Sequence, residues 1–354
     1  MAESISTHRR LYVLDGLRFV AATAVLLYHY FFRGWKADGM SILKFEYLGS
    51  MFKYGYLGVD LFFMISGFVI TLSIRHGSLG LFAISRFKRL YPVYWCCLLL
   101  TWISIQLYGS PQFQSSVKEL FLNLTMFQNY FFCKSVDGVY WTLFVEMKFY
   151  IFIIGIYLFL RKRFNVDLNG IIIVWLVLSY LFLFFPENIL AKLLDYIFIL
   201  KYSSYFIAGM VLFRIRDTGL SLTMACYLLL SLFLSLVNAY KRIPIFEAHY
   251  STEFSVTTVF LIISMIYIVM LFISTNRLES LQFEFLAPIG ALTYPLYLLH
   301  QKIGFIVMNR LGVYYNKYWI ILFLITIMII VSLFIVKIVE PPLRKAIMTI
   351  FNLK

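Results

Sequence analysis

Ten apolar segments, each close to the length needed to cross a lipid bilayer, dominate this sequence of 354 residues. A membrane-spanning helix needs roughly 20 consecutive apolar residues, because the hydrocarbon core is about 30 Å thick. The predicted spans lie approximately at 11–32, 56–74, 88–108, 139–160, 170–186, 197–214, 219–239, 254–274, 287–308 and 318–338. The sequence therefore predicts an all-α protein, a polytopic membrane bundle of about ten transmembrane helices.

The composition also favours a lipid environment. Hydrophobic residues make up 62% of the chain and charged residues only 14%, whereas soluble domains carry about 25% charged residues. The formal net charge is +14, which in a soluble protein would indicate nucleic acid. In a membrane protein, lysines and arginines instead collect in the loops and determine topology. We therefore expect the lipid bilayer as a partner and no nucleic acid.

The orientation follows from the basic residues of the short loops, which favour the cytoplasmic side. Compact basic runs at 161–163 and 214–216 fall on the side that also holds both chain ends, and the opposite side is assigned Lys241 and Arg242. We predict that both termini are cytoplasmic. No cleavage-site pattern follows the first apolar segment, so we expect it to be retained as a helix.

The four cysteines carry no recognisable metal or disulfide pattern. Cys96, Cys97, Cys133 and Cys226 form no Cys-x-x-Cys pair, and three of them lie in apolar segments. We interpret them as packing residues and expect neither a disulfide framework nor a bound metal.

Charged residues inside apolar spans are costly and usually serve a function, which makes the first span informative. It contains Asp15, Arg18 and His29. Arg18 and His29 are 11 residues apart, which places them on one helix face, about 16 Å apart along the axis. Asp15 lies one turn before Arg18 and can pair with it. A structural ion pair and an interfacial histidine are the alternatives to a functional role.

Two carboxylates are predicted to lie near the level of His29. Asp60 falls near the outer end of the second span and Glu146 in the outer third of the fourth. A carboxylate can orient an imidazole and raise its basicity, so we predict a histidine–carboxylate cluster suited to general base catalysis. The alternative for Asp60 is a helix cap or an interfacial anchor. Gly58 and Gly67 are predicted to allow close helix approach.

Two further groups of residues stand out. Arg86, Lys88 and Arg89 cluster at the mouth of the third span, where they either satisfy the preference for cytoplasmic positive charge or hold a phosphate through forked hydrogen bonds. In the ninth span, Tyr294, Tyr297 and His300 follow one another at three-residue spacing on one helix face. Pro295 interrupts the hydrogen-bond ladder there and is expected to kink the helix.

These motifs, in this order and spacing, resemble the membrane acyltransferase-3 family over nearly the whole chain. The family usually has serine where Thr142 stands, which is a departure. The matching segments are Leu-Asp-Gly-Leu-Arg (14–18) followed by His29, G-V-D-L-F-F…S-G-F (58–68), Arg-x-x-Arg (86–89) with Y-P-x-Y-W (91–95), W-T-L-x-x-E-x-x-F-Y (141–150), T-Y-P-L-Y-L-L-H (293–300) and E-P-P-L-R (340–344).

The resemblance implies a bacterial inner-membrane enzyme that O-acylates an O-antigen, an exopolysaccharide or another envelope glycan, free or lipid-linked. It implies an acyl-coenzyme A donor, usually acetyl-CoA, supplied from the cytoplasm. His29 takes the place of the proposed catalytic histidine and Arg18 of its motif partner, and Arg86 with Arg89 takes the place of the donor-binding pair. We expect one domain over 1–354, without the extracytoplasmic hydrolase-like domain that some members carry.

The predicted mechanism places the donor phosphates on Arg86 and Arg89, runs the pantetheine arm past Arg18, which is assigned to donor binding and catalysis, and brings the thioester near His29. His29, oriented by Asp60 or Glu146, either removes the proton from the sugar hydroxyl or first accepts the acyl group covalently. The acceptor or oxyanion contacts are assigned to Trp141, Tyr294 and His300. The principal alternative is a transporter or flippase that uses the same charges as a path. A structural or signalling membrane protein would leave these charges unexplained.

Overall fold

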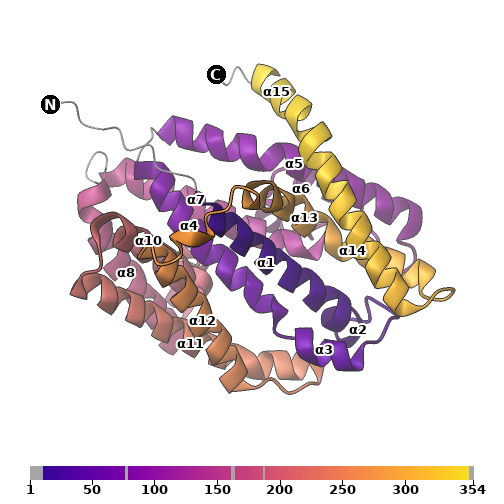
Figure 1. Ribbon diagram of the computed structural model, residues 1–354, viewed down its shortest axis with the longest axis horizontal. Helices are drawn as coiled ribbons and strands as arrows, with labels where there is room; N and C mark the ends of the chain where they lie inside the picture. The colour runs from indigo at the N-terminus through magenta and orange to yellow at the C-terminus, as the bar shows by residue number, and fades with distance from the viewer. Residues whose placement is uncertain (1–10, 76–78, 161–163, 186–187, 351–354) are drawn as a thin grey trace.

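The computed structural model describes residues 11–75, 79–160, 164–185 and 188–350. Every regular element in these residues is a helix, which confirms the predicted all-α fold class, and the helices pack into one bundle (Figure 1). The helices are α1 (Tyr12–Tyr28), α2 (Gly34–Lys36), α3 (Glu46–Phe52), α4 (Gly58–Arg75), α5 (Leu79–Tyr108), α6 (Val117–Asn123), α7 (Trp141–Leu160), α8 (Phe164–Phe184), α9 (Ile189–Phe198), α10 (Leu200–Thr218), α11 (Leu222–Tyr250), α12 (Val256–Ser274), α13 (Leu286–Leu311), α14 (Lys317–Phe334) and α15 (Glu340–Ile350).

Six helical stretches in the described part of the chain are long and apolar enough to cross a bilayer, or seven if α9 and α10, bent by 46°, form one broken span. A shorter apolar helix covers Leu168–Phe184, and α1 and α13 are not among the six. Within the described residues, each predicted segment falls mainly on helices, but the count of ten spans is approximate. The six stretches are Glu46–Ile74, Gly80–Tyr108, Gly138–Phe159, Leu222–Tyr250, Val256–Ser274 and Lys317–Ile350.

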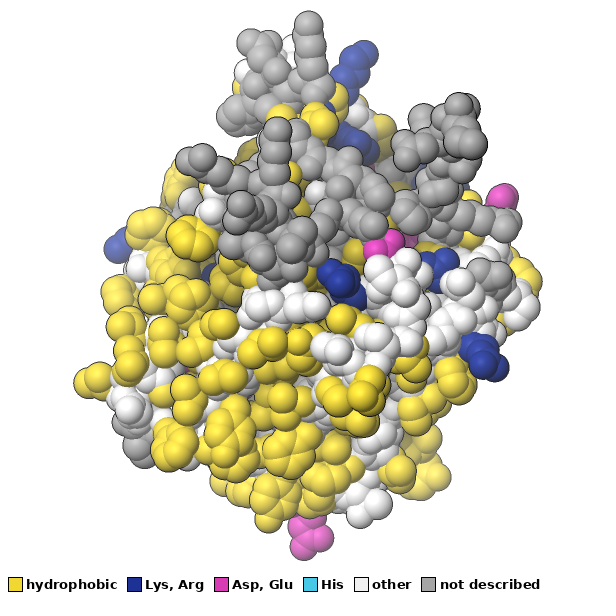
Figure 2. All heavy atoms as spheres, turned by 90° about the vertical axis from the view of Figure 1, so that its left-hand side faces the viewer, with side chains coloured by type: hydrophobic (Ala, Val, Ile, Leu, Met, Phe, Trp, Pro, Cys, Tyr) yellow, Lys and Arg dark blue, Asp and Glu magenta, His cyan; other side chains and the backbone are white. Residues whose placement is uncertain are grey.

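The bundle is apolar on its outside as well as in its core. Figure 2 shows hydrophobic side chains over much of the lower part of one face, with lysine and arginine side chains mainly above them. Large exposed side chains on the helices of this part of the bundle include Val174 and Val177 of α8, Leu229 and Phe233 of α11, and Leu261 and Met265 of α12. Such a continuous apolar surface suits lipid rather than water. The chain is a membrane protein.

Helix α1 runs parallel to α13, in close contact along its length. A Cβ added at Gly290 would overlap the side chain of Asp15, and one added at Gly304 would come within 2.5 Å of the Tyr30 ring. Small residues let two helix backbones approach closely in a membrane. These two contacts fix how far α13 lies along α1, and therefore where the side chains between them meet.

Helix α4 lies against α1 on one side and α10 on the other. A Cβ at Gly58 would lie 2.6 Å from the carbonyl oxygen of Ala21 in α1, and one at Gly67 would overlap the backbone of Phe206 in α10. The predicted role of Gly58 and Gly67 in close helix approach is therefore confirmed. The polar residues of α1 and α4 are consequently held inside the bundle.

The prediction that α11 ends near residue 239 and that Arg242 lies in a loop is wrong. The helix continues to Tyr250 through Lys241, Arg242 and Pro244. Arg242 therefore points from a helix into the bundle, where a buried carboxylate attracts it. The basic run at 161–163, on which the predicted orientation partly depends, lies outside the described residues.

Candidate active site

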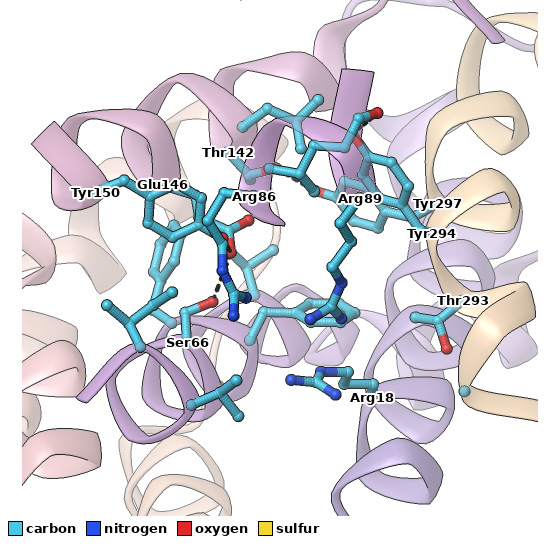
Figure 3. A pocket seen from close by; sticks show the side chains of 18 residues that line it. Arg18, Ser66, Arg86, Arg89, Thr142, Glu146, Tyr150, Thr293, Tyr294 and Tyr297 are labelled. Atoms are coloured by element: carbon cyan, nitrogen blue, oxygen red, sulfur yellow. Dashed lines mark hydrogen bonds between the residues drawn. The ribbon is translucent and has the colours of Figure 1, made fainter. Parts of the chain in front are cut away.

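Two neighbouring cavities contain most of the residues that the sequence singled out, and they share Val59 and Tyr297 as a common wall. We call the first the arginine cavity. It has a volume of about 110 Å³ and is lined by Arg18, Val59, Phe62, Phe63, Ser66, Val69, Ile70, Arg86, Arg89, Leu90, Thr142, Leu143, Glu146, Tyr150, Gly290, Thr293, Tyr294 and Tyr297 (Figure 3).

The second, which we call the histidine cavity, has a volume of about 180 Å³. It is lined by Val25, Tyr28, His29, Arg33, Tyr56, Val59, Asp60, Gly138, Val139, Trp141, Tyr202, Arg242, Phe246, Tyr250, Tyr297 and Gln301. Arg18 and His29 both project from α1 and its continuation, as their spacing predicts, but they open into different cavities. The wall of Val59 and Tyr297 separates the two.

Three arginines define the character of the arginine cavity. Arg86 and Arg89 reach it from α5, and Arg18 reaches it from α1, so that their guanidinium groups converge (Figure 3). The predicted pair of Asp15 and Arg18 is confirmed, with 3.1 Å between Oδ1 and Nη1. Arg86 donates a hydrogen bond of 2.8 Å to Ser73. Three guanidinium groups around one cavity form a site for a multiply charged anion such as a phosphate group.

Glu146 lies in the arginine cavity, in place of the predicted position beside His29. Its Oε1 accepts a hydrogen bond of 2.9 Å from Ser66 Oγ of α4 and another from the hydroxyl of Tyr150, one helical turn further along α7. Figure 3 shows the bond between Ser66 and Glu146 at the edge of the cavity. The carboxylate thus belongs to the surroundings of the arginines.

His29 is buried, with an exposed fraction of 6%, and begins the π-helical turn His29–Arg33 that continues α1. Single π-helical turns often occur at functional sites. Its Nδ1 lies 2.8 Å from the carbonyl oxygen of Val25 and 3.1 Å from Nε2 of His300. The predicted histidine–carboxylate cluster is thus replaced by a pair of histidines.

Asp60, predicted to orient His29, interacts with Arg242 instead. It is almost fully buried, at 1% exposed, and its Oδ1 lies 3.7 Å from Nη1 of Arg242. The guanidinium also lies over the rings of Tyr56, Tyr202 and Phe246, at 5.4–5.9 Å from their centroids. Sequence reasoning missed Arg242 because α11 was predicted to end before it. The buried charge of Asp60, which requires a partner, was the available signal.

Aromatic side chains cover much of the histidine cavity. The indole of Trp141 lies 5.4 Å from the Tyr202 ring, and the hydroxyls of Tyr28 and Tyr250 are 2.5 Å apart. Trp141, assigned from the sequence to acceptor or oxyanion contacts, lines this cavity. Tyr294, assigned to the same role, lines the arginine cavity instead and donates a hydrogen bond to the carbonyl oxygen of Leu90. His300, assigned to the same role, is not among the described residues that line the two cavities.

The shared wall is held by a hydrogen bond between two helices. The hydroxyl of Thr142 in α7 lies 2.9 Å from the carbonyl oxygen of Val139 and 3.0 Å from the hydroxyl of Tyr297 in α13. Since the carbonyl can only accept, the Thr142 proton points to it and Tyr297 donates to Thr142. Threonine at position 142 therefore keeps the hydroxyl that serine would supply. Tyr297 was placed on the right helix face from sequence, but its place between two cavities was not predicted.

Asp137 positions the start of α7 and has no counterpart in the sequence-based prediction. It is fully buried, and it accepts hydrogen bonds from the backbone N–H groups of Val139, at 3.1 Å, and Lys302, at 2.9 Å. It precedes the 3₁₀ turn Gly138–Tyr140 and so ties the loop before α7 to α13. Burial raises the pKa of this loop carboxyl to about 6.

The described part of the chain contains no group of three or more histidine, cysteine, aspartate or glutamate side chains arranged to hold a metal ion. The chemistry available at the two cavities is that of guanidinium groups, imidazoles, carboxylates and hydroxyls. These groups bind anions and transfer protons.

The chain is similar to known acyltransferases. A family model described as an acyltransferase domain, that of the acyltransferase-3 family, matches residues 11–337. Over 175 residues the chain is 26% identical to a predicted O-acetyltransferase of Staphylococcus aureus strain COL, a match that covers 43% of this chain and 26% of that protein.

A second relative is the peptidoglycan O-acetyltransferase OatA of Listeria monocytogenes strain EGD-e, which is 26% identical over 159 residues, with coverage of 39% and 22%. The matches thus span about a quarter of the length of these relatives. No solved structure matches the chain. Because the family model covers nearly all of the chain, the protein belongs to the acyltransferase-3 family.

Proposed function

We propose that this protein is a membrane O-acyltransferase that transfers an acyl group, most simply acetyl, from acyl-CoA to a sugar hydroxyl of an envelope or exported glycan. The observation that carries the proposal is the pair of adjoining cavities: one is surrounded by arginines, and the other contains a buried histidine. A transfer between two different substrates requires two such binding regions with a common boundary. Family membership and the names of the two relatives support an acetyl donor and a glycan acceptor.

In this proposal the arginine cavity receives the donor. Arg18, Arg86 and Arg89 hold the phosphate groups of coenzyme A by charge-assisted hydrogen bonds. Glu146, held by Ser66 and Tyr150, places a negative charge in the same cavity as the arginines when no donor is bound. The thin pantetheine arm passes the wall at Val59 and Tyr297 and brings the thioester to the histidine cavity.

The acceptor sugar occupies the histidine cavity. Sugar rings bury their apolar faces well against aromatic side chains, and Trp141 and Tyr202 supply such faces there. Asp60 and Arg242 add hydrogen-bonding groups for sugar hydroxyls, and their pairing keeps the buried charge balanced. The acceptor arrives free or lipid-linked from the outer side of a bacterial inner membrane, and both chain termini are cytoplasmic.

The proposed step is general base catalysis by His29. The imidazole removes the proton of the attacking sugar hydroxyl, whose oxygen forms a bond to the thioester carbonyl carbon. The carbon–sulfur bond then breaks, and the imidazolium returns the proton to the departing thiolate, so that the products are a sugar ester and coenzyme A. A covalent acyl-histidine intermediate would use the same residue in two steps.

The test is an assay with purified protein in detergent, radiolabelled acetyl-CoA and glycan acceptors extracted from the cell envelope. Wild type is expected to label the glycan. H29A and H29Q are expected to transfer the label at least about 100-fold more slowly. Both variants should still bind acetyl-CoA with wild-type affinity. If wild type labels no glycan but moves a lipid-linked sugar across the membrane of reconstituted vesicles, the protein is a transporter and the proposal is wrong.

A further inference from the structure

His300 of α13 uses both of its ring nitrogens within the bundle. Its Nδ1 lies 2.8 Å from the carbonyl oxygen of Tyr297, and its Nε2 lies 3.1 Å from Nδ1 of His29. The side chain is fully buried, at 0% exposed, and lines neither cavity. A ring with both nitrogens engaged and no access to the cavities cannot donate to a substrate oxyanion or hold the sugar.

The hydrogen-bond partners determine which nitrogens carry protons. A carbonyl oxygen only accepts, so Nδ1 of His300 is protonated, and in the neutral ring its Nε2 keeps a lone pair. Nδ1 of His29 faces two acceptors, the carbonyl oxygen of Val25 and this lone pair. It is therefore protonated as well, and the remaining lone pair of His29 is on Nε2.

The opposite arrangement is unfavourable. If Nε2 of His300 carried the proton, Nδ1 of His29 would have to accept it. Its lone pair would then face the carbonyl oxygen of Val25 at 2.8 Å, and two acceptors at this distance repel each other.

We propose that His300 is a positioning residue, which together with the Val25 carbonyl accepts the Nδ1 proton of His29 and so holds the ring with Nε2 free to act as the base. This inference rests on the proposed function, since it assigns His29 the role of base. In the reaction, the sugar hydroxyl proton moves to Nε2 of His29, and the lone pair of His300 then stabilises the positive charge through the Nδ1–H bond. The proton returns from Nε2 to the thiolate, and His300 is unchanged at the end.

The surroundings of His300 keep it in this position. The hydroxyl of Tyr30 in the π-helical turn donates a hydrogen bond of 3.0 Å to the carbonyl oxygen of His300. The ring of Tyr30 packs against Gly304, one turn further along α13 than His300. The π-helical turn that carries His29 and the helix α13 that carries His300 therefore contact each other directly beside the imidazole pair. The arrangement gives His29 a neutral orienting partner, where many enzymes use a carboxylate.

The test compares two substitutions that differ in one property. H300Q places an amide oxygen that accepts a hydrogen bond near the position of Nε2, whereas H300L fills a similar volume without an acceptor. We expect H300L to lower kcat about 100-fold with the KM values for acetyl-CoA and glycan unchanged, and H300Q to remain within about 5-fold of wild type. H249Q, at an exposed histidine, is the control and should match wild type.

A second measurement is independent of turnover. ¹⁵N spectra of protein labelled in its five histidines, with the His29 signals assigned by their loss in H29Q, should show protonated Nδ1 and unprotonated Nε2 in wild type and H300Q. In H300L the Val25 carbonyl remains as an acceptor, so Nδ1 of His29 should stay protonated but its signal should shift because the hydrogen bond to His300 is lost. Equal kcat for H300L and wild type, or an unchanged Nδ1 signal of His29 in H300L, would overturn the inference. Absence of transfer by wild type would instead overturn the proposed function, while the tautomer spectra would still test His300.

Discussion

Gly304 of α13 lies against the ring of Tyr30, so close that a Cβ at this glycine would approach the ring carbon Cε1 to 2.5 Å. Tyr30 also donates a hydrogen bond to the carbonyl oxygen of His300. The glycine therefore sets the separation of α1 and α13 one turn from the place where His29 and His300 meet. This close helix contact thus determines the geometry of the candidate catalytic histidine.

Substitution of Gly304 by alanine should impair transfer. The added methyl group must displace Tyr30 or part α1 from α13, which costs about 1–3 kcal/mol of stability and shifts His29 relative to its partner. Displacements of about 1 Å can lower turnover on the order of 100-fold. We expect G304A to insert into the membrane but to show at least about a 10-fold fall in kcat. G155A, at an α7 glycine with open space around it, is the control and should match wild type. Wild-type kcat in G304A would contradict the account.

Arg86 and Arg89 should determine donor affinity rather than the rate of the chemical step. Replacement by lysine keeps the charge and removes the forked hydrogen bonds, so R86K and R89K should each raise the KM for acetyl-CoA about 10-fold with kcat within about 2-fold of wild type. K88R, between the two arginines, is the matched control. S73A separates the loss of the Ser73 hydrogen bond of Arg86 from the loss of donor contact. An unchanged KM in both lysine variants would exclude donor binding at this cavity.

The buried pair of Asp60 and Arg242 should contribute more to stability than the partly exposed pair of Arg33 and Asp38. Removal of one partner of a buried ion pair costs about 3 kcal/mol, because the other charge stays buried. D60N and R242Q should each destabilise the protein by about this amount, and the double variant by less than the sum. The control is D38N, since Arg33 and Asp38 are 3.9 Å apart with side chains 30% and 42% exposed, and such pairs contribute less than about 1 kcal/mol. Unfolding in detergent micelles measures all four variants, and equal effects of D60N and D38N would contradict the prediction.

Asp137 should make stability depend on pH. Because burial raises its folded-state pKa to about 6, above the unfolded value of about 3.9, the folded protein binds this proton more tightly. The stabilising contribution is complete below the unfolded pKa and is lost as the pH rises through about 6. The unfolding temperature of wild type relative to D137N should therefore be highest near pH 4 and fall towards pH 7. A difference between the two proteins that does not vary with pH would show that the carboxyl does not titrate in this range.

The sequence was sufficient for the fold class and for the helices that carry the site. Long apolar segments identify the helices without tertiary information, and the spacing of Arg18 and His29 placed both on one face of α1. The Asp15–Arg18 pair and the close approach at Gly58 and Gly67 followed from rules that are local to one helix or one helix pair.

The partners of the site residues could not be predicted in the same way, because they come from distant helices. Glu146 was expected beside His29, but the rotation and depth of α7 place it beside Ser66, and His300 takes the expected position. Arg242 was assigned to a loop because lysine and arginine end an apolar segment in sequence. In the bundle the helix continues, since Asp60 and three aromatic rings stabilise its guanidinium group.

The most direct test of the central claim is proton NMR of envelope polysaccharide purified from cells that express wild type, H29Q or H249Q. The account predicts acetyl ester signals on the polymer with wild type and H249Q, and their loss with H29Q at equal membrane levels of the three proteins. Identical spectra for wild type and H29Q, with acetyl signals that depend on expression of the protein, would show that His29 is not the base. Polymers without any expression-dependent acetyl signal would contradict the assignment of an envelope glycan as the acceptor.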